Sequence, residues 1–333
     1  MGAKALSDCY SIGVDLGGTN LRVASYTGGV DFLDTITIPT RLAEGPGTVV
    51  TDICAAITTL IARQEGNRRL EAIAIGTPGP LELPEGILRS PPNLPGWDGF
   101  NLRKAIESTL NSPVLIESDA NLAALAEQQL GAGKTHVVDS LCVLTLGTGV
   151  GSGLILNGKI WHGATGMGGE AGHIIVRDTD GAPSGCGGYG CLEQYASASA
   201  IVRMARELME DDAPATAQQV AKLALTGHRD AALVFDYVGH SLAFALTGLV
   251  NTLNLPLFLL GGGACDAWEL FAPALFRELE SRSYVYRLTQ PAILEPSQLE
   301  RHETYILRAE LGPTAGLPGA CLYGLNKPSL LET

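Results

Sequence analysis

Three glycine-rich turns, each directly after a short apolar stretch, are the places where residue types and spacing best suit chemistry. They are GGTN at residues 17–20, GTGVGSG at residues 147–153 and GGG at residues 261–263. Glycine lets the backbone adopt φ > 0 and approach a ligand closely, and unpaired N–H groups in such a turn can face an anion, most often a phosphate. Glycines also gather wherever hairpins turn tightly, so plain structural turns are the alternative.

Polar side chains accompany these turns. Thr19, Thr145 and Thr148 offer hydroxyl donors without the charge of lysine, so a phosphate would be neutralised mainly by backbone N–H groups and Mg²⁺. Asp15 would repel a phosphate unless a cation lies between them, which makes it a candidate Mg²⁺ residue; the alternative is an aspartate that caps the glycine turn. The predicted ATP- and phosphate-binding residues are Asp15, Gly17, Gly18, Thr19, Asn20, Thr145, Gly147, Thr148, Gly149, Gly261, Gly262 and Gly263.

The turns differ from two common nucleotide-binding motifs. The sequence contains no G-x-x-x-x-G-K-[ST] of a P-loop and no G-x-G-x-x-G that opens a helix. After the first turn, apolar and polar residues alternate over residues 21–26, which predicts a strand. The first turn therefore joins two strands.

Composition narrows the class of protein. The chain has 333 residues, of which 46% are hydrophobic and 17% charged, and its net charge of −13 argues against a nucleic-acid-binding surface. The sequence has no run of about 18 or more apolar residues, so we predict no membrane span, and its first residues include no long apolar segment, so we expect no secretory leader. Seven cysteines, scattered and odd in number, suit a reducing cytoplasm better than a disulfide framework.

The elements that would position these residues alternate between strands and helices. Strand 72–76 ends at the turn Thr77-Pro78-Gly79-Pro80, and strand 114–117 is followed by a helix that opens at Asp119. The strand, glycine turn, strand pattern of residues 10–27 recurs at 141–156, which we interpret as a weak internal repeat. Apolar periodicity predicts helices over 192–209, 216–225, 229–253 and 313–323. Together these patterns predict an α/β protein of two domains with a nucleotide between them.

Four motifs in combination resemble the signatures of ROK family sugar kinases, which belong to the actin-like ATPase superfamily. They are DLGGTN at 15–20, GTGVGSG at 147–153, GEAGH at 169–173 and CGGYGCLE at 186–193. The resemblance covers roughly residues 10–325. It implies two actin-like (ribonuclease H-like) α/β domains around a hinged cleft, each with a five-stranded mixed sheet. We predict one domain from residues 1–118 with 311–333, whose C-terminal helix returns to it, and a second from 119–310.

Asp119 is the candidate catalytic residue. A carboxylate at a strand–helix junction is accessible, and the helix N-terminus stabilises its charged form, but aspartate is also a favoured N-cap. In the ROK family the matching Asp of N-D-A-N is the base that takes the proton from the sugar hydroxyl. This chain has Ser118 where the family usually has an asparagine that contacts the sugar.

The sugar itself is expected near Glu170, His173 and Glu193, because closely spaced carboxylates and a histidine suit hydroxyl recognition. The family resemblance implies the same three residues, and adds Gly79 and Asn93 from the other domain. Structural roles are the alternatives, with Glu193 as a helix-start charge and Asn93 as a turn residue. The predicted substrate-binding residues are Gly79, Asn93, Ser118, Asp119, Glu170, His173 and Glu193.

A metal site is the least settled expectation. Many ROK proteins carry a His-Cys₃ zinc site, and His173, Cys186 and Cys191 match three of its ligands, whereas Ser184 stands at the first cysteine position. A structural zinc prefers four ligands, mostly thiolate and imidazole. Zinc with water or another fourth ligand, no metal, and a Cys186–Cys191 disulfide all stay open.

These expectations define a cytoplasmic, ATP- and Mg²⁺-dependent hexose kinase that converts glucose to glucose 6-phosphate and forms a homodimer. N-acetylmannosamine, N-acetylglucosamine or fructose as substrate, and polyphosphate as donor, are alternatives. A catalytically silent sugar-binding ROK regulator is the alternative from another class. Such regulators carry a helix-turn-helix before the kinase-like part; the first glycine turn starts near residue 15 and the chain is acidic, which favours the kinase.

Overall fold

The computed structural model describes residues 8–29, 31–64, 68–209, 214–294, 298–300 and 302–326. The chain divides into two compact units. Unit 1 comprises Met1–Ala126, Ile160–Gly168 and Thr314–Thr333, and unit 2 comprises Glu127–Lys159 and Gly169–Pro313. Each unit is described by itself.

Unit 1 is built on a sheet in which the described residues form five strands in the order β3-β2-β1-β4-β7. β1 pairs antiparallel with β2 and parallel with β4, which in turn runs parallel to β7. The carboxyl ends of the three parallel strands therefore lie at one edge of the sheet. The strand bounds are β1 Cys9–Leu16, β2 Asn20–Tyr26, β3 Asp34–Pro39, β4 Arg69–Thr77 and β7 Val114–Ser118. A small hairpin, β5 Leu81–Glu82 and β6 Ile87–Leu88, lies between β4 and β7 in the chain.

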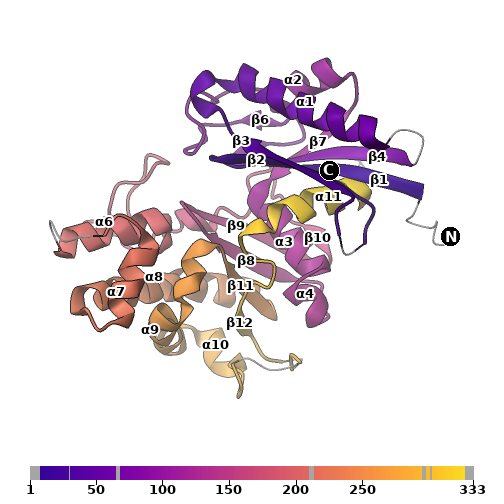
Figure 1. Ribbon diagram of the computed structural model, residues 1–333. Coiled ribbons are helices and arrows are strands. Elements are labelled where there is room, and N and C mark those ends of the chain that lie inside the picture. Colours follow the sequence, from indigo (N-terminus) through magenta and orange to yellow (C-terminus); the bar gives the residue numbers. More distant parts are fainter. Residues whose placement is uncertain are drawn as a thin grey trace. The chain divides into compact units, whose positions relative to one another are not determined.

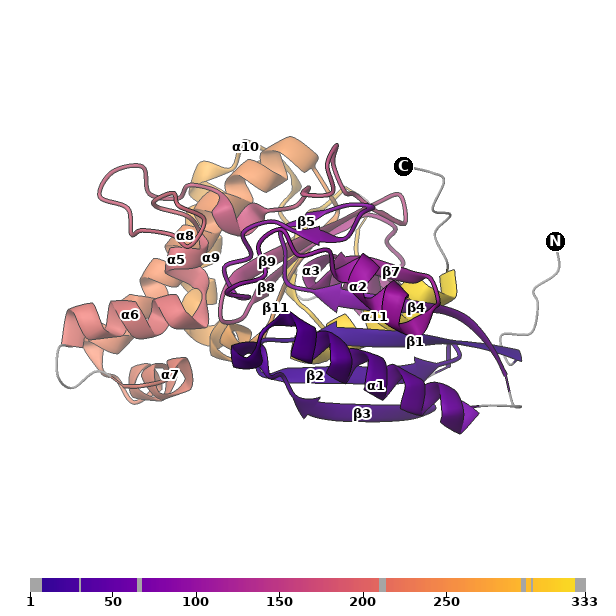
Figure 2. The ribbon, with the colours of Figure 1, turned by 90° about the horizontal axis from the view of Figure 1, so that it is seen from above.

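Helices cover both faces of this sheet. α1 (Pro46–Gln64) and α2 (Leu102–Leu110) bury apolar side chains against one face, with α1 over β1 to β3 and α2 over β4 and β7 (Figure 2). α11 (Gly316–Asn326) lies on the other face (Figure 1). A side chain at Gly13 of β1 would meet Cys321 Sγ at 2.5 Å, so glycine there lets α11 pack directly on the strand. The Ser11 hydroxyl adds a buried hydrogen bond of 2.7 Å to the Cys321 carbonyl.

The first half of α3 (Asp119–Gln129) also belongs to unit 1. A Cβ at Gly76 would lie 2.7 Å from the Leu122 side chain, and one at Gly319 would lie 2.0 Å from the Leu122 carbonyl oxygen. This close packing against β4 and α11 places residues 119–126 in unit 1. The domain boundaries that we predicted assign these residues to the second domain. Residues 160–168 lie in unit 1 as well, and residues 311–313 in unit 2. The predicted boundaries stay a prediction, and their ends at 1–7 and 327–333 lie outside the described residues.

Unit 2 repeats the same order of antiparallel and parallel pairs, β10-β9-β8-β11-β12 in the described residues. β8 turns back into antiparallel β9, and β11 lies parallel to both β8 and β12. The strand, glycine turn, strand pattern of the sequence thus corresponds to β1–β2 in unit 1 and β8–β9 in unit 2. The bounds are β8 Leu141–Leu146, β9 Val150–Leu156, β10 Lys159–Ile160, β11 Leu257–Gly261 and β12 Tyr305–Arg308.

Helices make up much of the rest of unit 2. They are α4 Ala132–Thr135, α5 Glu193–Ala196, α6 Ala198–Met209, α7 Ala217–Leu225, α8 Arg229–Leu253, α9 Trp268–Arg282 and α10 Tyr284–Thr289. The single helix predicted over 192–209 is wrong, because Ser197 is extended between α5 and α6. Its hydroxyl accepts the Ala200 N–H at 3.1 Å, which caps the start of α6.

α8 is long and apolar enough to cross a membrane by length and composition, with a mean hydropathy of 1.5 over its most apolar window. However, 56% of that window is buried inside the protein. A Cβ at Gly239 would lie 2.3 Å from the Phe271 carbonyl oxygen, so α8 packs closely along α9. This is the pattern of a core helix, and the lack of a membrane span stays a prediction.

Candidate active site

The first glycine turn joins β1 to β2 at the carboxyl edge of the unit 1 sheet. Thr40 fixes it from the end of β3, since its hydroxyl donates to the Gly17 carbonyl at 2.7 Å and its N–H donates to the Thr19 carbonyl at 2.8 Å. Gly18 and Thr19 are exposed, and a Cβ at Gly18 would meet no atom within 4 Å. The turn is therefore tethered through its carbonyl groups, and its tip has open space around it.

Asp15 lies opposite Arg22 in the β1–β2 pair. Its carboxylate is 16% exposed and sits 3.4 Å from the Arg22 guanidinium. Burial raises the pKa of Asp15, and the nearby Arg22 opposes that rise. Gly316, at the start of α11, leaves room beside this carboxylate, where a Cβ would lie 3.3 Å from Oδ1. Asp15 is thus a partly buried, arginine-paired carboxylate that shortly precedes the turn.

The second glycine turn, between β8 and β9 in unit 2, is held by α5 and α6. The Ala198 N–H donates to the Gly147 carbonyl at 2.8 Å, and the Ser199 hydroxyl donates to the Thr148 carbonyl at 2.5 Å. The Val150 N–H donates to the Glu193 carboxylate at 3.0 Å. Glu193 is the first residue of α5, so it both occupies a helix start and tethers the turn.

The third glycine site follows β11, which lies parallel to β8 with Gly261 opposite Thr145. Gly262 has a φ of 87°, and a Cβ there would lie 2.5 Å from the Leu146 carbonyl oxygen, so only glycine fits without strain. A short 3-10 helix, Gly263–Ala267, begins directly afterwards. The structure thereby brings Thr145, the second turn and the third turn to one edge of the unit 2 sheet.

Asp119 lies where β7 passes into α3, at the same edge of the unit 1 sheet as the first turn. One of its oxygens accepts the Ala120 N–H at 2.7 Å. Ser118 ends β7 opposite Thr77, the last residue of β4, so Gly79 follows close by in the same unit. Asn93 is exposed on a loop anchored by Leu94 and by the fully buried Trp97. In unit 1, therefore, Asp15, the first turn, Ser118 and Asp119 gather at one sheet edge.

Glu170 precedes a short 3-10 helix, Ala171–His173, which ends at His173 and packs on β9. The Ala171 N–H donates to the Ser152 hydroxyl at 2.9 Å, and a Cβ at Gly172 would lie 2.0 Å from the Val150 carbonyl oxygen. Burial raises the pKa of Glu170, His173 lowers it, and the Glu193 charge raises it further. Glu170, His173 and Glu193 therefore lie within electrostatic reach of one another in unit 2, as predicted substrate-binding residues would.

His173, Cys186 and Cys191 place their ligand atoms within 4.8 Å of one another. The two sulfur atoms are 3.6 Å apart as free thiols, and the Ser184 hydroxyl lies 3.4 Å from Cys186 Sγ. His173 Nδ1 is buried without a hydrogen-bond partner among the described residues. A buried imidazole nitrogen without a partner, beside two thiols, fits a divalent ion such as zinc, and the Ser184 hydroxyl lies next to one of these thiols.

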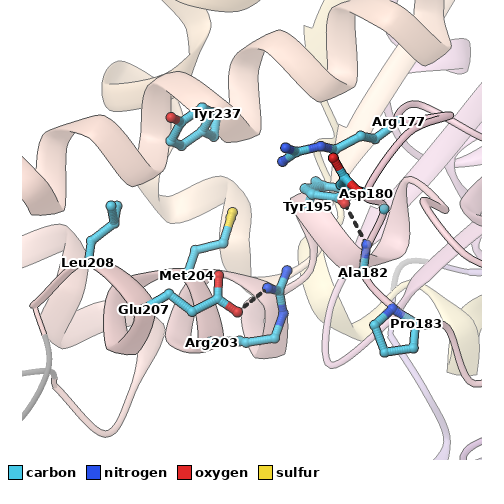
Figure 3. Close-up of a pocket in the computed structure, with 11 residues that line it drawn as sticks. Arg177, Asp180, Ala182, Pro183, Tyr195, Arg203, Met204, Glu207, Leu208 and Tyr237 are labelled. Carbon is cyan, nitrogen blue, oxygen red and sulfur yellow. Dashed lines mark hydrogen bonds and ion pairs between the residues drawn. The ribbon is translucent and has the colours of Figure 1, made fainter.

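Unit 2 also contains a cavity of about 660 Å³ that includes none of the predicted site residues (Figure 3). Arg203 pairs with Glu207 at 2.6 Å on one wall, and the Ala182 N–H donates to the Tyr195 hydroxyl at 2.8 Å on another. Arg203 also donates to the Gln194 carbonyl at 2.6 Å through Nη2, whereas its Nε is buried without a hydrogen-bond partner among the described residues. We assign this cavity no part in the candidate site.

Sequence reasoning missed two residues beside Asp119. Glu117, which immediately precedes Ser118, is fully buried, and His162 lies 2.6 Å from its carboxylate. A charged residue inside the apolar strand VLIES was the available signal for Glu117, because an ionised side chain in a buried strand needs a partner. The sequence contained no comparable signal for His162, which is separated from Glu117 by 45 positions.

The chain matches the ROK family over residues 11–314, and so belongs to that family. A glucokinase of Halalkalibacterium halodurans is 35% identical over 289 residues, which cover 83% of this chain and 87% of that enzyme. A xylose repressor of Caldicellulosiruptor bescii is 32% identical over 225 residues, which cover 64% of this chain and 55% of the repressor. Relatives of this chain thus include both enzymes and regulators.

Solved structures agree in fold. A ROK hexokinase from Thermus thermophilus has a TM-score of 0.76 and 33% identity, covering 94% of this chain and 97% of its own. A ROK family glucokinase from Streptomyces griseus, in complex with glucose and AMPPNP, has a TM-score of 0.72 and 31% identity. The match covers 94% of this chain and 98% of the glucokinase chain. The predicted α/β class with two actin-like domains is confirmed. The similarity to glucokinases and ROK kinase structures supports the class of sugar kinase.

Proposed function

We propose that this protein transfers the γ-phosphoryl group of ATP to a hexose hydroxyl, with glucose as substrate and glucose 6-phosphate as product. The observation that carries the proposal is the carboxylate of Asp119 at the same sheet edge as the Gly17–Asn20 turn, in a chain related to glucokinases. Ligands of α/β sheets bind outside the carboxyl ends of the strands. A structural relative that holds glucose and AMPPNP supports the choice of both substrates.

In this proposal the glycine turns bind the nucleotide. Backbone N–H groups of the Gly17–Asn20 and Gly147–Gly149 turns donate to the phosphates, with help from the hydroxyls of Thr19, Thr145 and Thr148, and Gly261–Gly263 lie beside the adenosine. Bound Mg²⁺ would supply positive charge that offsets the charge of the phosphates. Asp15 is the residue proposed to attract Mg²⁺, and its pairing with Arg22 offsets part of the rise in pKa that burial causes.

Asp119 acts as the general base. As the sugar oxygen attacks the γ-phosphorus, its proton passes to the Asp119 carboxylate, and ADP leaves with the bridging oxygen. Gly79, Asn93 and Ser118 from unit 1 and Glu170, His173 and Glu193 from unit 2 are the proposed sugar contacts. Carboxylates accept hydrogen bonds from hydroxyl pairs, which suits Glu170 and Glu193 to this role.

We also propose a structural zinc held by His173, Cys186 and Cys191, with Ser184 or water in the fourth position. Bound zinc would fix the loop that carries the sugar contacts, and it takes no part in the phosphoryl transfer. The convergence of the three donors and the orphaned His173 Nδ1 support this assignment. Metal analysis of protein prepared without chelators should find close to one zinc per chain, and a content well below one contradicts it.

The decisive experiment is a coupled ADP-release assay with Mg²⁺-ATP across glucose, fructose, mannose and the N-acetylhexosamines. We expect turnover with glucose at the highest kcat/KM, and a different preferred hexose would correct the substrate while leaving the kinase intact. Because xylose repressors are among the relatives, a sugar-binding regulator is the second candidate, and binding of sugar without turnover would favour it. A cytoplasmic homodimer that binds neither nucleic acid nor membrane remains our expectation.

A further inference from the structure

Glu117 is a fully buried carboxylate that the proposed chemistry leaves unexplained. It lies near the end of β7, two residues before Asp119, the first residue of α3. One oxygen, Oε1, accepts the Ser118 N–H at 2.8 Å and the Asn121 amide at 3.0 Å. These two donors lie on either side of Asp119 in the chain, so Glu117 fixes the backbone that carries the proposed base.

The other oxygen, Oε2, is occupied by His162, whose Nε2 lies 2.6 Å away. Because an ionised carboxylate only accepts hydrogen bonds, His162 donates through Nε2. The His162 side chain is 27% exposed, and its hydrogen bond with Glu117 raises its pKa in spite of partial burial. Tyr323 of α11 also contacts Glu117, and burial, the Glu117 charge and a hydrogen bond to the Glu117 side chain raise the pKa of this phenol.

The loop that carries His162 is itself closely packed in unit 1. The Gly168 N–H donates to the His162 carbonyl at 2.8 Å, which closes the loop on itself. Gly166 has a φ of 87°, and a Cβ there would lie 2.8 Å from Leu83 Cβ. His162 is therefore held against Glu117 by backbone contacts, and it can restrain the carboxylate in turn.

A buried carboxylate is costly unless it is paired and its remaining lone pairs are satisfied. Without His162, the Glu117 carboxylate would lose its hydrogen bond at Oε2 and be held less firmly, which weakens its hold on Ser118 and Asn121. The start of α3 would then relax, and Asp119 would lose its fixed position. We propose that Glu117 and His162 form a positioning pair that orients the proposed base, Asp119. This inference rests on the proposed kinase function.

The test compares His162→Leu, which removes the donor, with His162→Gln, which retains an N–H donor on a side chain of similar reach. We expect His162→Leu to lower kcat by between about 10-fold and about 100-fold with KM for ATP unchanged, because a misplacement near 1 Å has effects of that size. His162→Gln should recover kcat to within about threefold of the wild type, since it keeps a hydrogen bond. Ser11→Ala is the matched control, because it removes another buried unit 1 hydrogen bond that lies away from Asp119.

Glu117→Gln is the second variant, and it allows the proposal to be tested if His162→Leu does not fold. Its amide oxygen can still accept from Ser118 and Asn121, but the charge that attracts His162 is gone, so we expect a loss of kcat smaller than that of His162→Leu. Wild-type kcat in folded His162→Leu or in Glu117→Gln, or an equal loss in Ser11→Ala, would overturn the positioning role and leave the kinase standing. A wild-type protein that phosphorylates no sugar would instead overturn both proposals.

Discussion

Replacement of Asp119 by asparagine isolates its basicity from its place in the fold. The aspartate oxygen accepts the Ala120 N–H at 2.7 Å at the start of α3, and the asparagine carbonyl can accept the same hydrogen bond. The substitution removes the ability to take up a proton and the negative charge at the helix N-terminus. The variant should therefore fold normally and be impaired in the phosphoryl-transfer step, in which Asp119 would accept the sugar hydroxyl proton.

The magnitudes follow from these two losses. Removal of a positioned general base lowers kcat by about 10²-fold to 10⁴-fold, which corresponds to about 2.7–5.4 kcal/mol of activation free energy. The lost interaction with the helix N-terminus lowers the free energy of unfolding by only about 0.3–1 kcal/mol. The affinity for AMPPNP should stay within about twofold, because the proposed nucleotide contacts come from the glycine turns.

The assay is coupled ADP release at saturating hexose and Mg²⁺-ATP, with AMPPNP affinity measured by calorimetry and stability measured by denaturant unfolding. Asp34→Asn is the matched control, since it removes a carboxylate that pairs with Arg63 in unit 1 at 2.8 Å, at the end of β3 that lies opposite Ser25 and away from the glycine turn. Near-normal kcat in Asp119→Asn would refute the assignment of the base. A matched loss of AMPPNP affinity would show that Asp119 acts in nucleotide binding instead.

Three further predictions concern other residues. Hydrogen bonding to Glu117 raises the pKa of His162 above 6.5, so protonated His162 stabilises the fold fully below about pH 6.5 and this contribution is lost as pH rises through the raised value. The Tm difference between the wild type and His162→Gln should shrink accordingly, and a difference that does not vary with pH would contradict the charged pair. Ser184→Cys supplies a further thiolate beside Cys186, so zinc affinity measured by chelator competition should increase by about 10-fold or more, whereas Ser184→Ala should not increase it. Glu127 is buried and accepts the Ala132, Glu310 and Leu311 N–H groups at 3.2, 3.2 and 2.7 Å, so Glu127→Ala should lower the free energy of unfolding by about 3–5 kcal/mol in denaturant titrations. A loss below about 1 kcal/mol would show that water replaces the carboxylate.

Local patterns predicted the elements at the candidate site well. Strand 114–117 and a helix that opens at Asp119 correspond to β7 and α3, and the residues 229–253 predicted as a helix form α8. Apolar periodicity succeeds there because each element buries one side or all of its surface. The helix predicted over 192–209 failed because periodicity does not register a single extended residue, Ser197, whose hydroxyl caps the next helix.

The sequence by itself determined the family and the α/β class, and it supplied the candidate site residues as predictions, because glycine turns, their polar neighbours and the strand–helix junction are all local signals. Only the tertiary structure decided what surrounds Asp119. The contact of Glu117 with His162 joins residues 45 positions apart, and the packing of Gly319 on Leu122 joins α11 to α3. Such contacts depend on how distant elements fill the same space, and a buried charge reveals that it needs a partner without revealing which residue supplies it.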